Sequence, residues 1–347
     1  MPPSPVIVVC AVTLISVLVK VLLIYKRENV LDNVLSLPDC AQLVTSGRLK
    51  IPSSLSNWWS KVDLFPSHAG KEIVRPVLFD NIPAVLKLKR LPEKCLSIAE
   101  TIRGTQTTPL EHVRRSVQAN YHEGVTEPLL NRIESEDLES IFCRLQQPEY
   151  FFLLWASLLK RSSPHFPRLL GTCGEVYIVE NVEEVLNEEF IRSKSWNEMQ
   201  PVINSFISLT EHLNHVSIQL CDVKLDNFGW DPSTQEVKMV DLDTAFFTGS
   251  LQEQFRERQC VSDEDCHLFS CRGCCDVPNR KCLVKIADNN LVRICREIFA
   301  PRFMEMGLFS GAPLAKKERL FKLAKNCGRF QMDWSDFRSA YQPEIAQ

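Results

Sequence analysis

The residues best suited to chemistry lie in one short acidic motif, residues 221–227, and at Asp241. Within the motif, Asp222, Lys224 and Asn227 supply an acid, a cation and an amide close together in the chain. Phosphoryl transfer needs these groups, because an acid orients the acceptor hydroxyl, a cation neutralises the transferring phosphate and an amide oxygen binds the metal ion. The spacing therefore predicts a phosphoryl-transfer centre in which Asp222 and Lys224 are catalytic. A capped turn at Asp222 and a solvated Lys224 are the simpler alternatives.

The sequence between the motif and Asp241 predicts a β-hairpin. Residues 228–230 are apolar, residues 231–234 have the composition of a turn, and residues 237–240 resemble a strand. Such a hairpin would bring Asn227 and Asp241 into one site, where both could bind Mg²⁺ (or Mn²⁺), which prefers oxygen ligands. A polar surface loop beside an ordinary hairpin is the alternative.

Lys87 and Glu149 are candidates for binding ATP. Lys87 lies in the strand-like run 84–89, a pattern typical of the kinase strand whose lysine binds the α and β phosphates. Lys89 lies on the same face of that strand but fits the motif less well. Glu149 lies one residue after Pro148, which opens a predicted helix, and we expect it to pair with Lys87. The alternative is an acid placed there by the helix dipole.

Three features depart from the usual kinase pattern. No G-x-G-x-x-G loop precedes Lys87, so the backbone amides that normally cover the phosphates of ATP are not predicted. Leu220 and Cys221 stand where His and Arg are usual, and the loss of that Arg argues against control by activation-loop phosphorylation. Asp243 replaces a Gly and adds a carboxylate, which would bind a second ion or repel the first.

Length and charge limit the other possibilities. The 347 residues, 45% of them hydrophobic, suffice for one two-lobed domain or two small ones. A formal net charge of −3 gives no general attraction to nucleic acid, which is not an expected partner. No internal repeat is visible, so a solenoid is not expected.

Residues 6–24 are apolar except for Lys20 and two hydroxyl side chains. A helix of this length can cross a hydrocarbon core of about 30 Å. A cleaved signal peptide is the alternative, but no small-x-small cleavage site follows, so we predict a signal anchor in residues 1–27. Lys26 and Arg27 follow the segment and would place the body in the cytosol by the positive-inside rule.

The cysteine content argues against the cytosol and favours an oxidising compartment. Of fourteen cysteines, Cys10 lies in the apolar segment. Six others form one dense cluster: Cys260, Cys266, Cys271, Cys274, Cys275 and Cys282. A segment with so little apolar content cannot form its own core, so we predict disulfides among these six. Zinc bound by Cys271 and Cys274 is the alternative, although no matching second pair follows. The cysteines other than Cys10 number thirteen. Because thirteen is odd, one thiol would be free or would form an intermolecular disulfide.

The motifs together resemble a known family, the divergent protein kinase domain proteins, which are cysteine-rich type II membrane proteins of the endoplasmic reticulum. The resemblance lies in residues 221–230, residues 241–243, the cysteine cluster 260–282 and residues 169–174. It implies an α+β, bilobal protein-kinase-like fold with an N-terminal transmembrane helix and a disulfide-rich insert after the metal-binding Asp. It also implies a luminal body, and we let this outweigh the positive-inside rule.

The expected organisation follows from that resemblance and from the order of elements, with strands first and helices later. We expect a signal anchor at 1–27, a luminal stem at 28–71, an N-lobe at 72–182, and a C-lobe at 183–347 with a cysteine-rich insert at 256–285. The expected activity is transfer of phosphate from ATP, with Mg²⁺, to a hydroxyl of a secretory-pathway protein or glycan. A pseudokinase that serves as a binding or scaffold module is the alternative, and transfer of AMP is a third.

Overall fold

The computed structural model describes residues 35–52, 71–89, 107–121, 129, 138–158, 164–256, 258–301, 306–329 and 332–345. The chain divides into two compact units, a smaller one from Met1–Leu96 and Leu169–Asn181 and a larger one from Ser97–Arg168 and Val182–Gln347. The predicted anchor at residues 6–24 lies outside the described residues. Within the described ranges, no helix is long and apolar enough to span a membrane.

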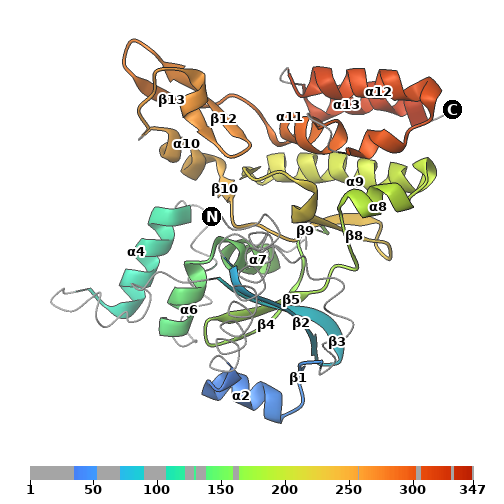
Figure 1. Cartoon of the computed structure of the whole chain (residues 1–347). Coiled ribbons are helices and arrows are strands. Elements are labelled where there is room, and N and C mark those ends of the chain that lie inside the picture. The colour runs from blue at the N-terminus through green and yellow to red at the C-terminus, as the bar shows by residue number, and fades with distance from the viewer. Residues whose placement is uncertain are drawn as a thin grey trace, which may run out of the picture. The chain divides into compact units, whose positions relative to one another are not determined.

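An antiparallel sheet with the strand order β1-β2-β3-β5-β4 forms the smaller unit (Figure 1). Its strands are β1 (Leu49–Lys50), β2 (Lys71–Phe79), β3 (Ile82–Lys89), β4 (Leu169–Cys173) and β5 (Val176–Glu180). β2 and β3 form the expected hairpin, with Asp80 and Asn81 at positive φ angles of 51° and 64°. Asp and Asn tolerate this left-handed conformation in two-residue turns, so the strand carrying Lys87 is set by its own local sequence.

Helix α2 (Pro38–Thr45) belongs to the same unit. Cys40, on this helix, is buried in one apolar cluster with Leu49 and Leu86 of the sheet. A disulfide joins Cys40 to Cys173 at the end of β4. The described part of the predicted stem is therefore built into the smaller unit.

The larger unit contains most of the helices and three small antiparallel sheets. Its α-helices are α4 (Pro109–Tyr121), α6 (Leu138–Leu145), α7 (Pro148–Leu158), α8 (Glu188–Ser193), α9 (Trp196–His215), α10 (Thr248–Arg256), α11 (Asn290–Ile294), α12 (Leu314–Cys327) and α13 (Trp334–Ile345). Its strands are β6 (Glu184–Val185), β7 (Ile218–Leu220), β8 (Phe228–Asp231), β9 (Glu236–Met239), β10 (Ala245–Phe247), β11 (His267–Leu268), β12 (Cys271–Asp276) and β13 (Lys281–Ile286). Short 3₁₀ segments are η3 (Leu225–Asn227), η4 (Asp263–Cys266) and η6 (Leu308–Gly311), and η5 (Cys295–Phe299) is π-helical. Residues 97–168, which we assigned to the N-lobe, pack with this unit.

Helix α9 is the long central helix of the larger unit (Figure 1). It begins in a capping box, in which Ser195 and Glu198 satisfy each other's backbone N–H groups. Its buried Phe206 contacts Phe299 edge-on, and Phe299 stacks on Phe337 of α13. This apolar core supports the loop that follows α9.

The hairpin predicted between the two motifs is confirmed as β8 and β9, with Phe228 opposite Met239. Asp231 closes its turn by accepting hydrogen bonds from Ser233, and it forms an ion pair of 3.0 Å with Lys238. Because both members of the ion pair are buried, the hairpin has a fixed register.

The cysteine-rich insert is a small sheet in the order β11-β12-β13 beside α10. Disulfides Cys260–Cys275 and Cys266–Cys282 cross-link it, and their two half-cystines Cys275 and Cys282 lie opposite each other in register. Cross-linking of the insert is therefore confirmed.

Five of the six candidate cysteines are disulfide-bonded, and the prediction was wrong for the sixth. Cys274 is free, although we included it among the cross-linked residues. It lies at a register shift in β12 between Gly273 and Cys275, and it is Cys275 that faces the next strand. Cys271 is disulfide-bonded as predicted, and its partner is Cys221 of the acidic motif, so the alternative zinc site at Cys271 and Cys274 is not formed.

Candidate functional site

The acidic motif follows strand β7 directly and forms a loop that ends in the short helix η3. Asn227 is buried at the end of this loop and donates two hydrogen bonds from Nδ2 to Asp222, one to the backbone oxygen at 2.7 Å and one to Oδ2 at 2.9 Å. These bonds fold the loop back on itself and orient the Asp222 carboxylate. They use only the donor end of the amide, so the acceptor Oδ1 of Asn227 lies on its other side.

Lys224 lies next to the same carboxylate. Its Nζ is 3.0 Å from Asp222 Oδ2, and both side chains are partly exposed. Asp222 Oδ2 therefore accepts from Asn227 and pairs with Lys224, whereas Oδ1 accepts no hydrogen bond within the described part of the chain. An ammonium group has three donors, so Lys224 can contact Asp222 and an anionic ligand together.

The hairpin brings Asp241 to the loop. Val240 N–H donates to the backbone oxygen of Asn227 at 2.9 Å, so the residues on either side of this bond are neighbours. Asp241 Oδ1 accepts the N–H of Asp243 at 3.0 Å, which fixes its carboxylate at the end of β9. The structure thus brings Asn227 and Asp241 together, as the hairpin predicts.

The carboxylate of Glu149, from another element, lies close to the carboxylates of Asp241 and Asp243. Oxygens of Glu149, Asp241 and Asp243 all lie within 4.8 Å of one another, with Glu149 fully buried. Glu149 comes from the first turn of α7, as expected. Carboxylate oxygens at such spacing match the hard ligands that Mg²⁺ or Mn²⁺ requires, so the chemistry of this donor set fits a divalent cation.

Aromatic side chains support this cluster. Tyr121 of α4 stacks on Phe151 of α7 with ring centroids 3.5 Å apart, and Phe152 packs against Phe247 at 5.1 Å. Burial, and then the negative charge of Asp243, raise the pKa of the Tyr121 hydroxyl, which donates to the backbone oxygen of Leu145. Asp243 of the carboxylate cluster thus lies close enough to this group of packed rings to act on Tyr121.

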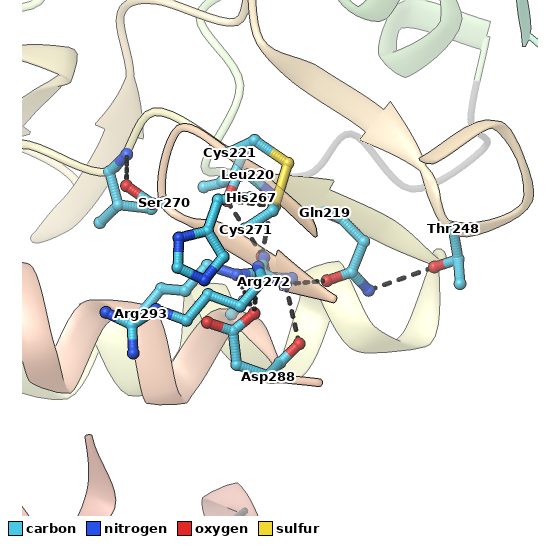
Figure 2. Close-up of a disulfide and its surroundings, with 12 residues drawn as sticks. Gln219, Leu220, Cys221, Thr248, His267, Ser270, Cys271, Arg272, Asp288 and Arg293 are labelled. Carbon is cyan, nitrogen blue, oxygen red and sulfur yellow. Dashed lines mark hydrogen bonds and ion pairs between the residues drawn. A yellow bond between two sulfur atoms is a disulfide. The ribbon is translucent and has the colours of Figure 1, made fainter. Parts of the chain in front are cut away.

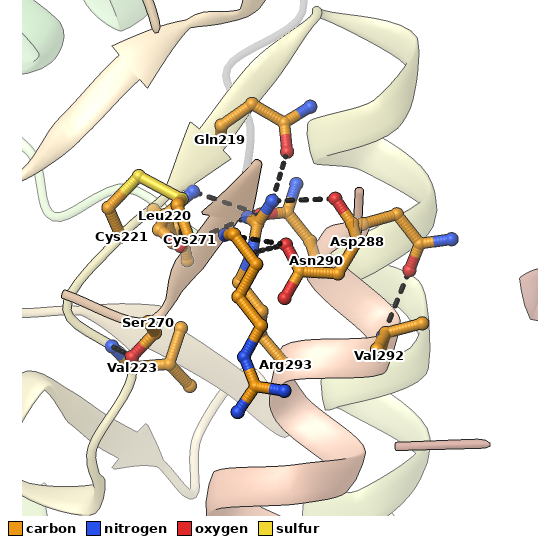
Figure 3. A network of polar contacts seen from close by, with 12 residues as sticks. Gln219, Leu220, Cys221, Val223, Ser270, Cys271, Asp288, Asn290, Val292 and Arg293 are labelled. Atoms are coloured by element: carbon orange, nitrogen blue, oxygen red, sulfur yellow. Dashed lines mark hydrogen bonds and ion pairs between the residues drawn. A yellow bond between two sulfur atoms is a disulfide. The ribbon is translucent and has the colours of Figure 1, made fainter. Parts of the chain in front are cut away.

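Strand β7, which leads into the loop, is held by a buried polar network (Figure 3). Arg293 is fully buried and donates to the backbone oxygen of Leu220 at 3.1 Å and to Gln219 Oε1 at 3.0 Å. Asn290 accepts from the Leu220 N–H at 2.9 Å. Burial lowers the pKa of the Arg293 guanidinium, and the Asp288 carboxylate at 2.9 Å opposes this.

Lys87 lies in the smaller unit, on β3, with a side chain only 5% exposed. Lysines are rarely so buried, and the choice of Lys87 over Lys89 stays a prediction. The proposed pair of Lys87 with Glu149 would join the two units and stays a prediction.

Several residues that hold the site were not found by sequence reasoning. Asp288, Asn290 and Arg293 follow the cysteine-rich insert and carry no recognisable motif. Cys221 was interpreted only as a replacement for an arginine, but it is disulfide-bonded to Cys271. The odd number of cysteines outside the apolar segment indicated one unpaired thiol, which is Cys274 among the described residues, but it carried no signal for the partner of Cys221.

A protein family and a solved viral structure are similar to this chain. Residues 141–330 match the family described as the protein-kinase domain of FAM69, which is more than half of the 347 residues. The solved structure of the Cydia pomonella granulovirus kinase PK-1 is similar over 60% of this chain and 56% of its own length, with 12% sequence identity and a TM-score of 0.31. The chain thus spans little more than half of that viral kinase, and a likeness this distant leaves the kinase assignment to the sequence family.

Proposed function

This chain belongs to the family defined by the protein-kinase domain of FAM69, and from that premise we propose that it transfers phosphate from ATP to a hydroxyl group. The observation that carries the proposal is the bond between Asn227 and Asp222, because it links a metal-binding amide to the acid that would receive the acceptor. A polar surface loop, the alternative interpretation, does not require a buried Asn with both donors directed at one acid.

Each side chain of the loop has a role that follows from its contacts. Asp222 Oδ1 would accept the proton of the acceptor hydroxyl, since Oδ2 is already engaged. Lys224, partly exposed beside it, would neutralise charge on the transferring group. Asn227 Oδ1, Asp241 and the neighbouring Asp243 would hold a divalent cation, which when bound supplies charge neutralisation at the phosphates.

Lys87 and Glu149 would act on the nucleotide. Lys87 is buried on β3, where a lysine can bind the α and β phosphates, and Glu149 would orient it. Glu149 also lies within the carboxylate cluster, so it could contribute to the cation site instead.

We further propose that the body lies in the lumen of the endoplasmic reticulum, with residues 6–24 as the anchor. Five disulfides with both cysteines in the described residues support an oxidising compartment, because such bonds are rare in the cytosol. The acceptor would then be a hydroxyl of a secretory-pathway protein or glycan.

A pseudokinase is the second candidate. It is favoured by the absence of a G-x-G-x-x-G sequence before Lys87, because backbone amides of that loop normally bind the phosphates. A pseudokinase would transfer no phosphate, whether or not it still binds a nucleotide or a metal ion.

Thermal melts of the full chain with Mg·ATP test the binding step. At ligand concentrations of about 100 Kd the stabilisation is about 2.7 kcal/mol, and we expect Asp241→Asn to abolish it. Asp226→Asn is the matched control, because Asp226 is an exposed acid of the same loop and should leave the shift in place.

Labelling of a secretory-pathway extract tests transfer. We expect label from γ-labelled ATP with the wild type, and far less with Asp222→Asn, which should still bind Mg·ATP. Label from α-labelled ATP instead would indicate transfer of AMP. Binding without label would support the pseudokinase, and the absence of both would reject every function based on ATP.

A further inference from the structure

The cysteine-rich insert contacts the acidic loop on both sides of Asp222. Ser270 N–H donates to the backbone oxygen of Cys221 at 2.6 Å, and Val223 N–H donates to Ser270 Oγ at 3.1 Å. The Cys221–Cys271 disulfide adds a covalent link, with Cα atoms 4.8 Å apart (Figure 2). One residue of the insert, Ser270, is therefore hydrogen-bonded to both neighbours of the proposed base.

Buried charges hold Ser270 in place. Its backbone oxygen accepts from Arg296 Nη2 at 2.7 Å, and Arg296 Nη1 is 3.0 Å from Asp288 Oδ2. Asp288 also accepts the N–H of Arg272 at 3.2 Å, on the far side of the disulfide. Arg296 and Asp288 are both buried, and a satisfied buried network of this kind is rigid.

Such contacts determine where the Asp222 carboxylate points. With the backbone groups of Cys221 and Val223 both fixed, the main-chain angles of Asp222 have little freedom, and its Cα–Cβ bond has one direction. A general base acts only within hydrogen-bonding reach of its proton. Misplacement by about 1 Å can lower a rate by about 100-fold.

We propose that Ser270, together with the Cys221–Cys271 disulfide, positions Asp222 for catalysis. The insert then holds the loop in its active form by covalent and hydrogen bonds, without phosphorylation, in a loop where Cys221 replaces the arginine that usually binds the phosphate. The inference rests on the proposed phosphotransfer. Ser270 acts through Asp222 and is a positioning residue.

Steady-state kinetics of the full chain test this on the acceptor that the labelling identifies. We expect Ser270→Ala to lower kcat about tenfold or more while the shift in melting temperature with Mg·ATP is unchanged. Ser270→Thr keeps the acceptor oxygen and should restore most of the rate. Ser310→Ala is the matched control, because Ser310 Oγ accepts a backbone N–H from Gly307 at the same 3.1 Å in another part of the unit.

A double-mutant cycle separates positioning from general stability. If Ser270 acts through the carboxylate, Ser270→Ala should have little further effect on the residual rate of Asp222→Asn. An equal loss in both backgrounds would show that Ser270 only supports the fold and would overturn the proposal.

The disulfide is tested in the same way. Replacing Cys221 and Cys271 with Ser should lower kcat at least as much as Ser270→Ala. Replacing Cys260 and Cys275 removes a disulfide within the insert and should leave kcat within about twofold. If the wild type transfers phosphate and neither Ser270→Ala nor the Cys221/Cys271 variant loses rate, the positioning role is refuted and the phosphotransferase activity stands. If the wild type transfers no phosphate, the phosphotransferase activity itself is refuted.

Discussion

Asn227 Nδ2 lies 2.7 Å from the backbone oxygen of Asp222 and 2.9 Å from its Oδ2. One amide group therefore fixes both the main chain and the side chain of the acid five residues before it. The same side chain keeps its oxygen as an acceptor, so the orientation of the proposed base and the binding of the proposed cation would depend on a single buried residue.

Asn227→Ala should lower both stability and function. Loss of the buried amide removes two hydrogen bonds to Asp222, at its backbone oxygen and at Oδ2, and should destabilise the fold by about 1–3 kcal/mol. The shift in melting temperature with Mg·ATP should also disappear, because a metal ligand is lost. Asn279→Ala is the control: Asn279 Nδ2 donates to Asp276 Oδ2 at 2.7 Å, but in an exposed turn. Equal losses of stability in the two variants would contradict the buried role of Asn227.

The Asp231–Lys238 pair should be important for stability, because it fixes the hairpin that presents Asp241. Burial by itself raises the pKa of Asp231, but hydrogen bonds from Ser233 and Lys238 outweigh it, and the net effect lowers the pKa. Breaking a buried pair from one side destabilises by about 3–5 kcal/mol, so Asp231→Asn should lower the free energy of unfolding by an amount approaching this range at pH 7.

The pH dependence of that effect follows from the lowered pKa. Stability contributed by Asp231 is present above the unfolded-state pKa of about 3.9 and is lost as the pH falls further through the folded-state pKa. Urea unfolding at pH 7 and pH 2.5 should therefore show a large difference between Asp231→Asn and wild type at pH 7 and a smaller one at pH 2.5. Glu188→Gln, which breaks the exposed pair with Arg192, should change stability by less than about 0.5 kcal/mol.

His165 should make the protein sensitive to mild acid. It is buried, with Nδ1 2.8 Å from the backbone oxygen of Val237, and burial lowers its pKa. Below about pH 6.5 the unfolded state then binds a proton that the folded state does not, so stability falls with pH, by at most about 1.4 kcal/mol per unit. Melts between pH 7.5 and 5.5 should show a smaller loss of stability for His165→Gln than for the wild type.

Local patterns in the sequence were enough to predict the hairpins and the loop residues. The turn at Asp80 and Asn81 and the hairpin from Phe228 to Met239 are formed by neighbours in the chain, so their sequence signals are short-range. Glu149 could be placed in the first turn of a helix for the same reason.

Long-range partners could not be predicted in this way. Arg293 contacts Gln219, which precedes it by 74 residues, and Cys221 pairs with Cys271 across 50 residues. Neither contact has a local pattern, because their geometry depends on how the insert packs against the loop. With six clustered cysteines, many pairings satisfy the composition equally, and only the register of β12 and β13 selects Cys275 and Cys282 as opposite neighbours.

Gly229 should be intolerant of any side chain. A Cβ at this position would lie 2.5 Å from a methyl carbon of Val182 and 3.2 Å from the backbone oxygen of Glu184, because Gly229 of β8 is paired with the antiparallel strand β6 here. Gly229→Ala must therefore push β6 away or move the hairpin, and we expect a loss of about 1–3 kcal/mol in the free energy of unfolding. Gly311→Ala is the control, since no atom lies within 4 Å of its added Cβ. Chemical denaturation of both variants measures the difference. If the shift reaches Asn227 and Asp241, Mg·ATP should also stabilise Gly229→Ala less than wild type, whereas equal stability of the two alanine variants would show that β6 moves aside freely.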